Sequence, residues 1–189
     1  MTPSAQPSQQ IQPELGAGER LFWAGQPRQG VVLRGSDAFL IPFSLMWGGF
    51  SFFWETSVIQ SDAPGFFVLW GIPFVIMGTY LIAGRFLVDA KQRAHTWYGV
   101  TNERILIVSG LFSRKVKSLN LRTLTDLSMS EKQGGEGTIT FGSGLPFGDW
   151  FAGFGGWPGM EAQMSPRFEL IPHVKTVYET IRAAQRDAR

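Results

Sequence analysis

The side chains that could do chemistry are few and widely spaced. His95 and His173 are the only histidines, and the chain has no cysteine. A metal site needs several His, Cys, Asp or Glu ligands at workable spacing. No His-x-x-x-His or His-x-x-Glu pair occurs at either histidine. We therefore expect surface or capping roles for both, no catalytic residue, and no metal or other cofactor.

Two glycine-rich pieces could hold phosphate if they formed nucleotide-binding loops. They are residues 134–137 (GGEG) and 142–144 (GSG). Neither is followed by the Lys-Ser/Thr pair of such a loop, and neither precedes a helical pattern. A Gly-x-Ser-x-Gly elbow, which would support hydrolase chemistry, is also missing from the sequence. The glycines predict turns, and the chain is not expected to be an enzyme.

One cluster of basic residues could contact anionic lipid headgroups. Attraction near a membrane surface is worth about 1 kcal/mol per basic side chain. The alternative is a solvated face of a strand, which the imperfect alternation along the segment favours. Net charge is only +2, too small to indicate a nucleic-acid partner. The candidate headgroup contacts are Arg114, Lys115, Lys117 and Arg122.

An aromatic and glycine-rich stretch, residues 142–166, is the most unusual local feature. Large rings on a flexible backbone suit an adaptable contact surface for a partner or for the bilayer interface. The alternative is a loop that folds back and buries its rings on its own domain. The candidate contact residues are Phe147, Trp150, Phe151, Phe154 and Trp157.

Two uncharged stretches flank a short acidic connector. One is the 17 residues between Asp37 and Glu55, and the other is the 22 residues between Asp62 and Arg85. A bilayer core needs roughly 20 apolar helical residues. A soluble helix normally keeps one polar face, so the length without charge favours membrane helices over buried core helices. We predict a transmembrane hairpin with spans 38–54 and 63–83.

The charges around this hairpin predict its orientation. Lys and Arg are enriched in cytoplasmic segments, and they occur here on both flanks but not in the connector. Both termini should therefore be cytoplasmic in a multi-pass protein of the cell membrane. Gly48 and Gly49 would allow a second helix to approach closely. The basic flanking residues are Arg20, Arg28, Arg34, Arg85, Lys91 and Arg93.

The remainder of the chain predicts strands and one final helix. Residues 96–170 are rich in alternating β-branched and aromatic residues separated by turn signals. Residues 18–27 fit either a segment on the headgroups or a strand on the following domain. Residues 1–17 include a Gln-, Pro- and Ser-rich run that predicts a disordered tail. The final helix shows an apolar stripe at Val174, Val177, Tyr178 and Ile181.

Several motifs in this order resemble bacterial pleckstrin-homology-like (PH-like) domains. They are residues 98–107 (YGVTNERILI), the Gly110 turn, the following basic strand, residues 121–127 (LRTLTDL) and 137–142 (GTITFG). The segment 18–27 (GERLFWAGQP) and a two-helix membrane hairpin also resemble members of that family. The resemblance implies a bent antiparallel β-barrel capped by a C-terminal helix. It also implies interaction or membrane scaffolding rather than catalysis.

The expected organisation is a membrane α-hairpin joined to a mostly-β domain. It comprises a tail (1–17), a juxtamembrane segment (18–36), the hairpin (37–88) and a cytoplasmic PH-like domain (89–189). The expected function is that of a scaffold or accessory subunit at the membrane, which binds another membrane protein or self-associates. The alternative is an anionic-lipid sensor. Lipids are expected partners in either case, and nucleic acid is not.

Overall fold

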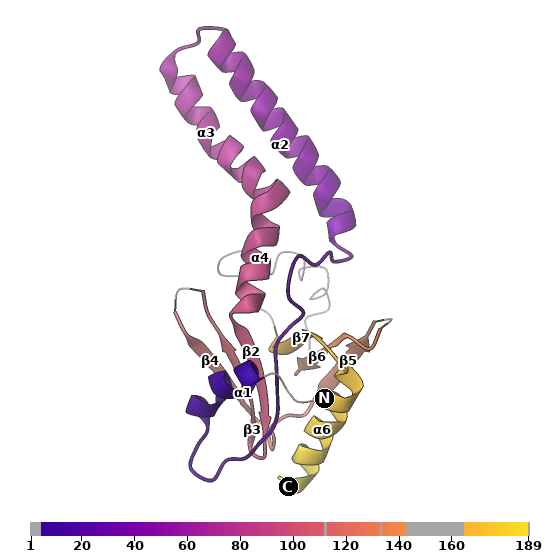
Figure 1. The fold of residues 1–189 in the computed structure, drawn as a ribbon. Coiled ribbons are helices and arrows are strands. Elements are labelled where there is room, and N and C mark those ends of the chain that lie inside the picture. Colours follow the sequence, from indigo (N-terminus) through magenta and orange to yellow (C-terminus); the bar gives the residue numbers. More distant parts are fainter. Residues whose placement is uncertain (1–4, 112, 133, 143–164, 189) are drawn as a thin grey trace. The chain divides into compact units, whose positions relative to one another are not determined.

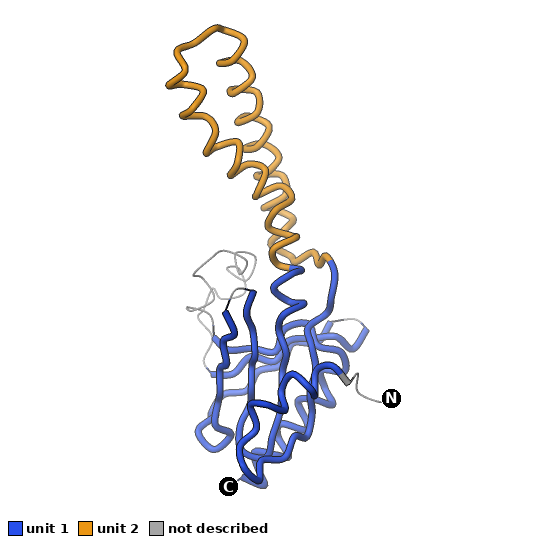
Figure 2. Tube along the Cα trace, turned by 60° about the vertical axis from the view of Figure 1, so that its left-hand side comes forward, with its two compact units in different colours: residues 1–30, 90–148, 162–189 blue, residues 31–89, 149–161 orange. Residues whose placement is uncertain are grey.

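The computed structural model describes residues 5–111, 113–132, 134–142 and 165–188 (Figure 1). The chain divides into two compact units (Figure 2). We call residues 1–30, 90–148 and 162–189 the β domain. We call residues 31–89 and 149–161 the hairpin unit. Each unit is described by itself.

The β domain contains two antiparallel sheets. The first has the order β1-β2-β3-β4 and the second the order β5-β6-β7. Strands β2 and β3, in the region where the sequence predicts alternation, form a hairpin that turns at Asn102 and Glu103. The strands are β1 (Leu21–Gly25), β2 (Thr96–Thr101), β3 (Arg104–Ser109), β4 (Lys115–Asn120), β5 (Leu127–Glu131), β6 (Gly137–Phe141) and β7 (Arg167–Ile171).

The main core of the β domain is centred on Phe168. Its ring lies 4.5 Å from that of Tyr98, 5.0 Å from Phe141 and 5.6 Å from Trp23, measured between centroids. Helix α6 (Val174–Asp187) contacts strands of both sheets and closes this core. Val174, Val177 and Ile181 of the predicted stripe are buried there, and Tyr178 is half-buried.

Strand β1 settles one alternative that the sequence left open. Leu21 to Gly25 pairs with β2 through a register shift between Leu21 and Trp23. The segment is therefore a strand of the β domain. Its backbone hydrogen bonds are made within the first sheet, which is why the short apolar run needs no headgroup contact to be ordered.

The N-terminal segment differs from the disordered tail that its composition predicts. Residues Ala5–Ile11 form helix α1, and Gln12–Glu14 form a 3-10 turn. Ile11 is fully buried and packs with Leu106 and Val108 on the face of the first sheet opposite the main core. Gly99 makes room for it, because a Cβ at Gly99 would lie 2.9 Å from Ile11 Cγ2. Burial of Ile11 thus helps to order a segment whose other residues are mostly polar.

The hairpin unit contains two packed helices. Helix α2 runs from Asp37 to Gln60 and α3 from Gly65 to Thr79. A π-helical segment, Tyr80–Gly84, then joins α3 to α4 (Arg85–Ala94), within which the boundary between the two units falls. Glu55, predicted in the connector, lies inside α2, so the connector is shorter than expected and spans only 61–64.

The hairpin buries small and polar side chains and exposes large apolar ones. We call this the inverted arrangement, because a soluble protein does the reverse. The buried positions of α2 are Asp37, Ser44, Gly48 and Ser51, and large apolar side chains on both helices are exposed. Among the described residues, one helix, Gly65–Ala94, is long and apolar enough to cross a membrane. Helix α2 is not among the helices that meet this measure.

Candidate functional site

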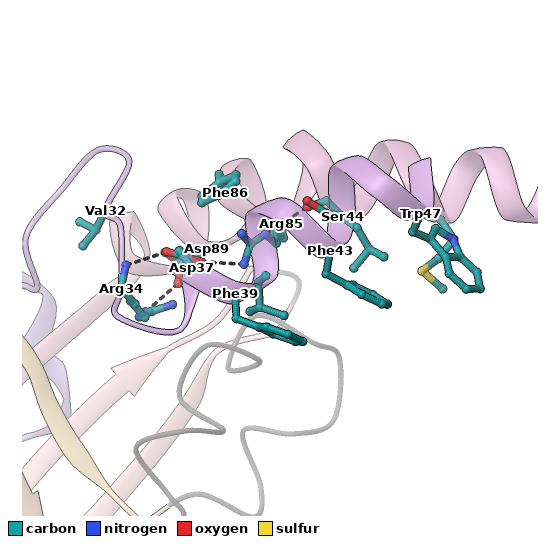
Figure 3. A pocket seen from close by; sticks show the side chains of 13 residues that line it. Val32, Arg34, Asp37, Phe39, Phe43, Ser44, Trp47, Arg85, Phe86 and Asp89 are labelled. Carbon is teal, nitrogen blue, oxygen red and sulfur yellow. Dashed lines mark hydrogen bonds and ion pairs between the residues drawn. The ribbon is translucent and has the colours of Figure 1, made fainter. Parts of the chain in front are cut away.

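Four charged side chains meet at the base of the hairpin (Figure 3). Arg85 donates to Asp37 at 2.7 Å, and Arg34 donates to Asp89 at 3.0 Å. The backbone N–H of Arg34 also donates to the Asp37 carboxylate at 2.6 Å. The side chains are only 8 to 16% exposed. The four residues, which we call the base cluster, have no net charge, as a buried ionic group requires.

Two nitrogens and one face of the Arg85 guanidinium are in contact with other groups. Nη1 donates to Asp37, Nε donates to the Leu81 carbonyl at 3.1 Å, and the Phe86 ring lies 4.3 Å from Cζ. Nη2 is buried and has no hydrogen-bond partner within the described part of the chain. A buried donor without a partner costs about 1 to 3 kcal/mol, and more for a charged group. This nitrogen is therefore a candidate ligand contact.

An apolar groove adjoins the base cluster and has a volume of about 350 Å³. Phe39, Phe43 and Trp47 line one wall, and Figure 3 shows them projecting from the same side of α2. Met77 and Leu81, one turn apart, line the other wall. Both walls follow the four-residue spacing that places side chains on one helix face. The groove thus has an apolar body and a charged end.

Of the two glycines predicted to pack against a helix, only one faces α3. Gly48 is buried against Gly78 of α3, where a Cβ would meet backbone or Ile82. A Cβ at Gly49 would meet nothing within 4 Å among the described atoms. Successive residues lie about 100° apart around a helix, so only one of the two can face the contact. Gly48 therefore closes the chain's own hairpin, whereas Gly49 takes no part in this contact and its predicted packing against a second helix stays a prediction.

In the β domain, an ion pair joins the residues before β1 to the start of β3. Glu19 accepts from Arg104 at 2.8 and 2.9 Å and from the Thr101 hydroxyl at 2.6 Å. The Arg104 hydrogen bond is the main reason that the pKa of Glu19 falls from 4.5 to about 2. The Glu19 side chain is 2% exposed, against 33% for Arg104. This arrangement fixes β1 to the β2–β3 hairpin and leaves no reactive group open.

The four residues of the predicted basic cluster have different surroundings in the structure. Arg114 is held at α1, where it donates to the Gln10 carbonyl and to Glu14. Lys115 and Lys117 are exposed on β4 and pair in register with Ser109 and Ile107. Alternation along the strand places both lysines on the face of Leu119, which packs against the main core. Arg122 is exposed beyond the end of β4.

The sequence of this fold matches a known family over most of its length. The model of the bacterial PH domain matches residues 40–185, from within α2 to within α6. The chain belongs to the bacterial PH domain family. Comparison with curated proteins and comparison with solved structures gave no match. Membership agrees with the antiparallel sheets and the C-terminal helix that the motifs predict.

In this bacterial PH domain protein, one predicted contact site remains without a structural description. Phe147, Trp150, Phe151, Phe154 and Trp157 lie outside the described residues. Within the described ranges, no group of three or more His, Cys, Asp or Glu residues could hold a metal ion.

The base cluster is the feature of this PH domain protein that sequence reasoning missed. In the sequence, Arg34 and Arg85 indicate only flanking charges that set orientation. The available signal was that Asp37 and Arg85, of opposite sign, end the two uncharged stretches. Antiparallel helices place these two ends side by side, so an ion pair between them could have been predicted.

Proposed function

We propose that this protein is a non-catalytic, membrane-anchored interaction protein. The hairpin unit is its anchor, and the PH domain binds another membrane protein as a scaffold or accessory subunit. The inverted arrangement of the hairpin carries the proposal. Its helices bury Ser44, Gly48, Ser51 and Gly78 and expose phenylalanines and leucines. Small residues at the contact and large apolar residues outside are typical of membrane helices.

The serine hydroxyls of the hairpin also support a lipid environment. Ser44 donates to the Ile41 carbonyl at 2.9 Å, and Ser51 donates to the Trp47 carbonyl at 2.8 Å. Each hydroxyl is thus satisfied by its own helix, as lipid surroundings demand. In water, so much exposed apolar surface would instead be a site of association.

The direction of the anchor follows from its charges. Arg34 and Arg85 lie at the base of the hairpin, whereas the connector has Asp62 and no basic residue. The positive-inside bias therefore places the base and both termini in the cytoplasm. The PH domain would then lie on the cytoplasmic side of the membrane.

The position of a partner is narrowed by the packing of the hairpin. Gly48 is used within the chain, whereas the Gly49 side of α2 has room for a helix of a partner. Anionic-lipid sensing by the basic residues is the weaker alternative. Arg114 is engaged by α1, which leaves Lys115, Lys117 and Arg122 for such a contact.

Labelling of single cysteines tests the anchor and its direction. The chain has no cysteine, so Ser61→Cys in the connector and Ser118→Cys on β4 introduce unique thiols at exposed positions. A membrane-impermeant maleimide should label Ser61→Cys in intact cells and Ser118→Cys only after permeabilisation. Release of the protein by alkaline carbonate, or the reverse labelling pattern, would contradict the proposal.

Purification of the full chain in mild detergent tests the interaction role. A stoichiometric protein partner, reduced by Gly49→Leu but retained in Lys115→Gln/Lys117→Gln, is the expected result. Membrane-inserted protein that has no protein partner, and binds anionic vesicles through the two lysines, would favour the lipid-sensor alternative instead.

A further inference from the structure

The groove beside the base cluster has the form of a lipid site. Its two walls are about 12 Å long, since Phe39 to Trp47 and Met77 to Arg85 each span eight helical steps of about 1.5 Å. One wall ends at Phe39 and the other at Arg85. One leaflet of the bilayer core is about 15 Å thick. An acyl chain lying in this groove would therefore cross most of one leaflet.

The charged end of the groove offers a donor for a phosphate. Arg85 Nη2 is buried and, among the described residues, unpartnered. The side chain is already held by Asp37, by the Leu81 carbonyl and by Phe86, so Nη2 is fixed before a ligand arrives. Arginine suits phosphate because its guanidinium is always charged, and here Nη2 still has N–H groups to donate.

The helix opposite α2 is irregular at this point. Residues Tyr80–Gly84 are π-helical, and the Arg85 N–H reaches back to the Tyr80 carbonyl. The Leu81 carbonyl accepts from the Arg85 side chain. Single-turn π segments often mark functional sites. Here the segment carries Leu81 on the groove wall and directly precedes Arg85, so it sets the position of both.

The charges of the base cluster distinguish between headgroups. Two arginines and two aspartates are neutral together. A purely anionic headgroup has no positive charge to place beside the carboxylates of Asp37 and Asp89. A zwitterionic headgroup presents a phosphate to Arg85 and an ammonium to those carboxylates.

We propose that the groove binds one phosphatidylethanolamine-type phospholipid. Its phosphate lies at Arg85 Nη2, its ammonium lies near Asp37 and Asp89, and one acyl chain lies between the apolar walls. The proposal rests on the membrane anchoring proposed above. It assigns the hairpin a specific ligand in addition to its role as an anchor.

Native mass spectrometry of the full chain in mild detergent tests this site. Dioleoyl phosphatidylethanolamine should bind at one molecule per chain, at least tenfold more tightly than dioleoyl phosphatidylglycerol. Arg85→Lys keeps the charge facing Asp37 but loses the spare nitrogen, and should weaken binding at least tenfold. Arg28→Lys, an exposed arginine outside the groove, should leave binding unchanged.

A second pair of variants keeps the test decisive if Arg85→Lys does not fold. Leu81→Trp fills the groove, whereas Ile76→Trp adds the same ring at an exposed position that does not line it. Only Leu81→Trp should lose the lipid. Equal binding by both variants, or preference for phosphatidylglycerol, would overturn the proposal.

The result of the lipid-binding test can be separated from the result of the test for membrane anchoring. The binding assay uses only protein extracted from the membrane fraction. Protein found in the soluble fraction would refute the anchor itself. Membrane-extracted protein that binds no phosphatidylethanolamine would refute the lipid site alone.

Discussion

The Cα of Gly48 lies 2.9 Å from where a Cβ on Gly78 would stand, so α2 and α3 touch backbone to backbone. Such proximity is possible only without side chains at the contact. In the proposed membrane environment, lipid tails would leave little hydrophobic drive between the helices, and dispersion at this close contact would hold them together.

Gly78→Ala should therefore destabilise the hairpin. The new methyl group meets the backbone of Gly48, which cannot turn away, and overpacking of this kind costs about 1 to 3 kcal/mol. Thermal unfolding in mild detergent measures the loss. Gly49→Ala, which faces open space, should match the parent or exceed it slightly. An equal loss in both variants would contradict the packing.

The Asp37–Arg85 pair predicts strong coupling at the base of the hairpin. Asp37→Ala leaves the Arg85 charge buried without its partner, which typically costs about 3 to 5 kcal/mol. The double variant Asp37→Ala/Arg85→Leu should lose less than the sum of the two single variants, because no charge is then stranded. Unfolding in detergent measures all three. Asp126→Ala, at an exposed carboxylate, is the control and should change little.

The Glu19–Arg104 pair predicts an acid-sensitive β domain. The pKa of Glu19 is about 2 in the folded protein, against its ordinary 4.5. Stability from this pair is complete above about pH 5. It is lost as the pH falls towards 2, because the unfolded chain takes up the proton first. The loss is on the order of 3 kcal/mol.

Urea unfolding at several pH values from 2.5 to 6, followed by tryptophan fluorescence, measures this dependence. Glu19→Gln should lower stability at pH 6 and flatten the pH profile. Glu103→Gln, at an exposed neighbour of Arg104, should preserve the profile of the parent. A profile that is equally steep in Glu19→Gln would show that other carboxylates control acid unfolding.

The burial of Ile11 predicts that the N-terminal segment contributes to stability. Ile11→Ala should cost about 2 to 4 kcal/mol, as for other buried aliphatic truncations. It should also abolish hydrogen-exchange protection in α1. Gln9→Ala, on the exposed side of α1, should do neither. If both variants behave as the parent, the segment is not held against the first sheet.

The local patterns predicted much of the β domain. Alternation predicted strands where β2, β3, β5, β6 and β7 occur, and those predictions are confirmed. The stripe from Val174 to Ile181 correctly predicted α6. These elements follow from the sequence because each shows its own period, and because the periods agree with how the elements pack.

The features that could not be predicted depend on contacts distant in sequence. Ile11 is ordered by Leu106 and Val108, residues that the composition of the first 17 positions cannot indicate. The sequence predicts one basic cluster, but Arg114 turns to α1 while Lys115 and Lys117 remain on β4. In each case a partner more than 90 positions away decides where the side chain goes.

The position of β4 gives its lysines a further consequence. Among the described strands, β4 ends the first sheet, so one side of its backbone has no strand partner there. An unpaired strand can recruit a strand from another molecule and start aggregation. A second β4 aligned alongside would bring Lys115 and Lys117 against like charges. We therefore expect the two lysines to oppose edge-to-edge association of neighbouring molecules.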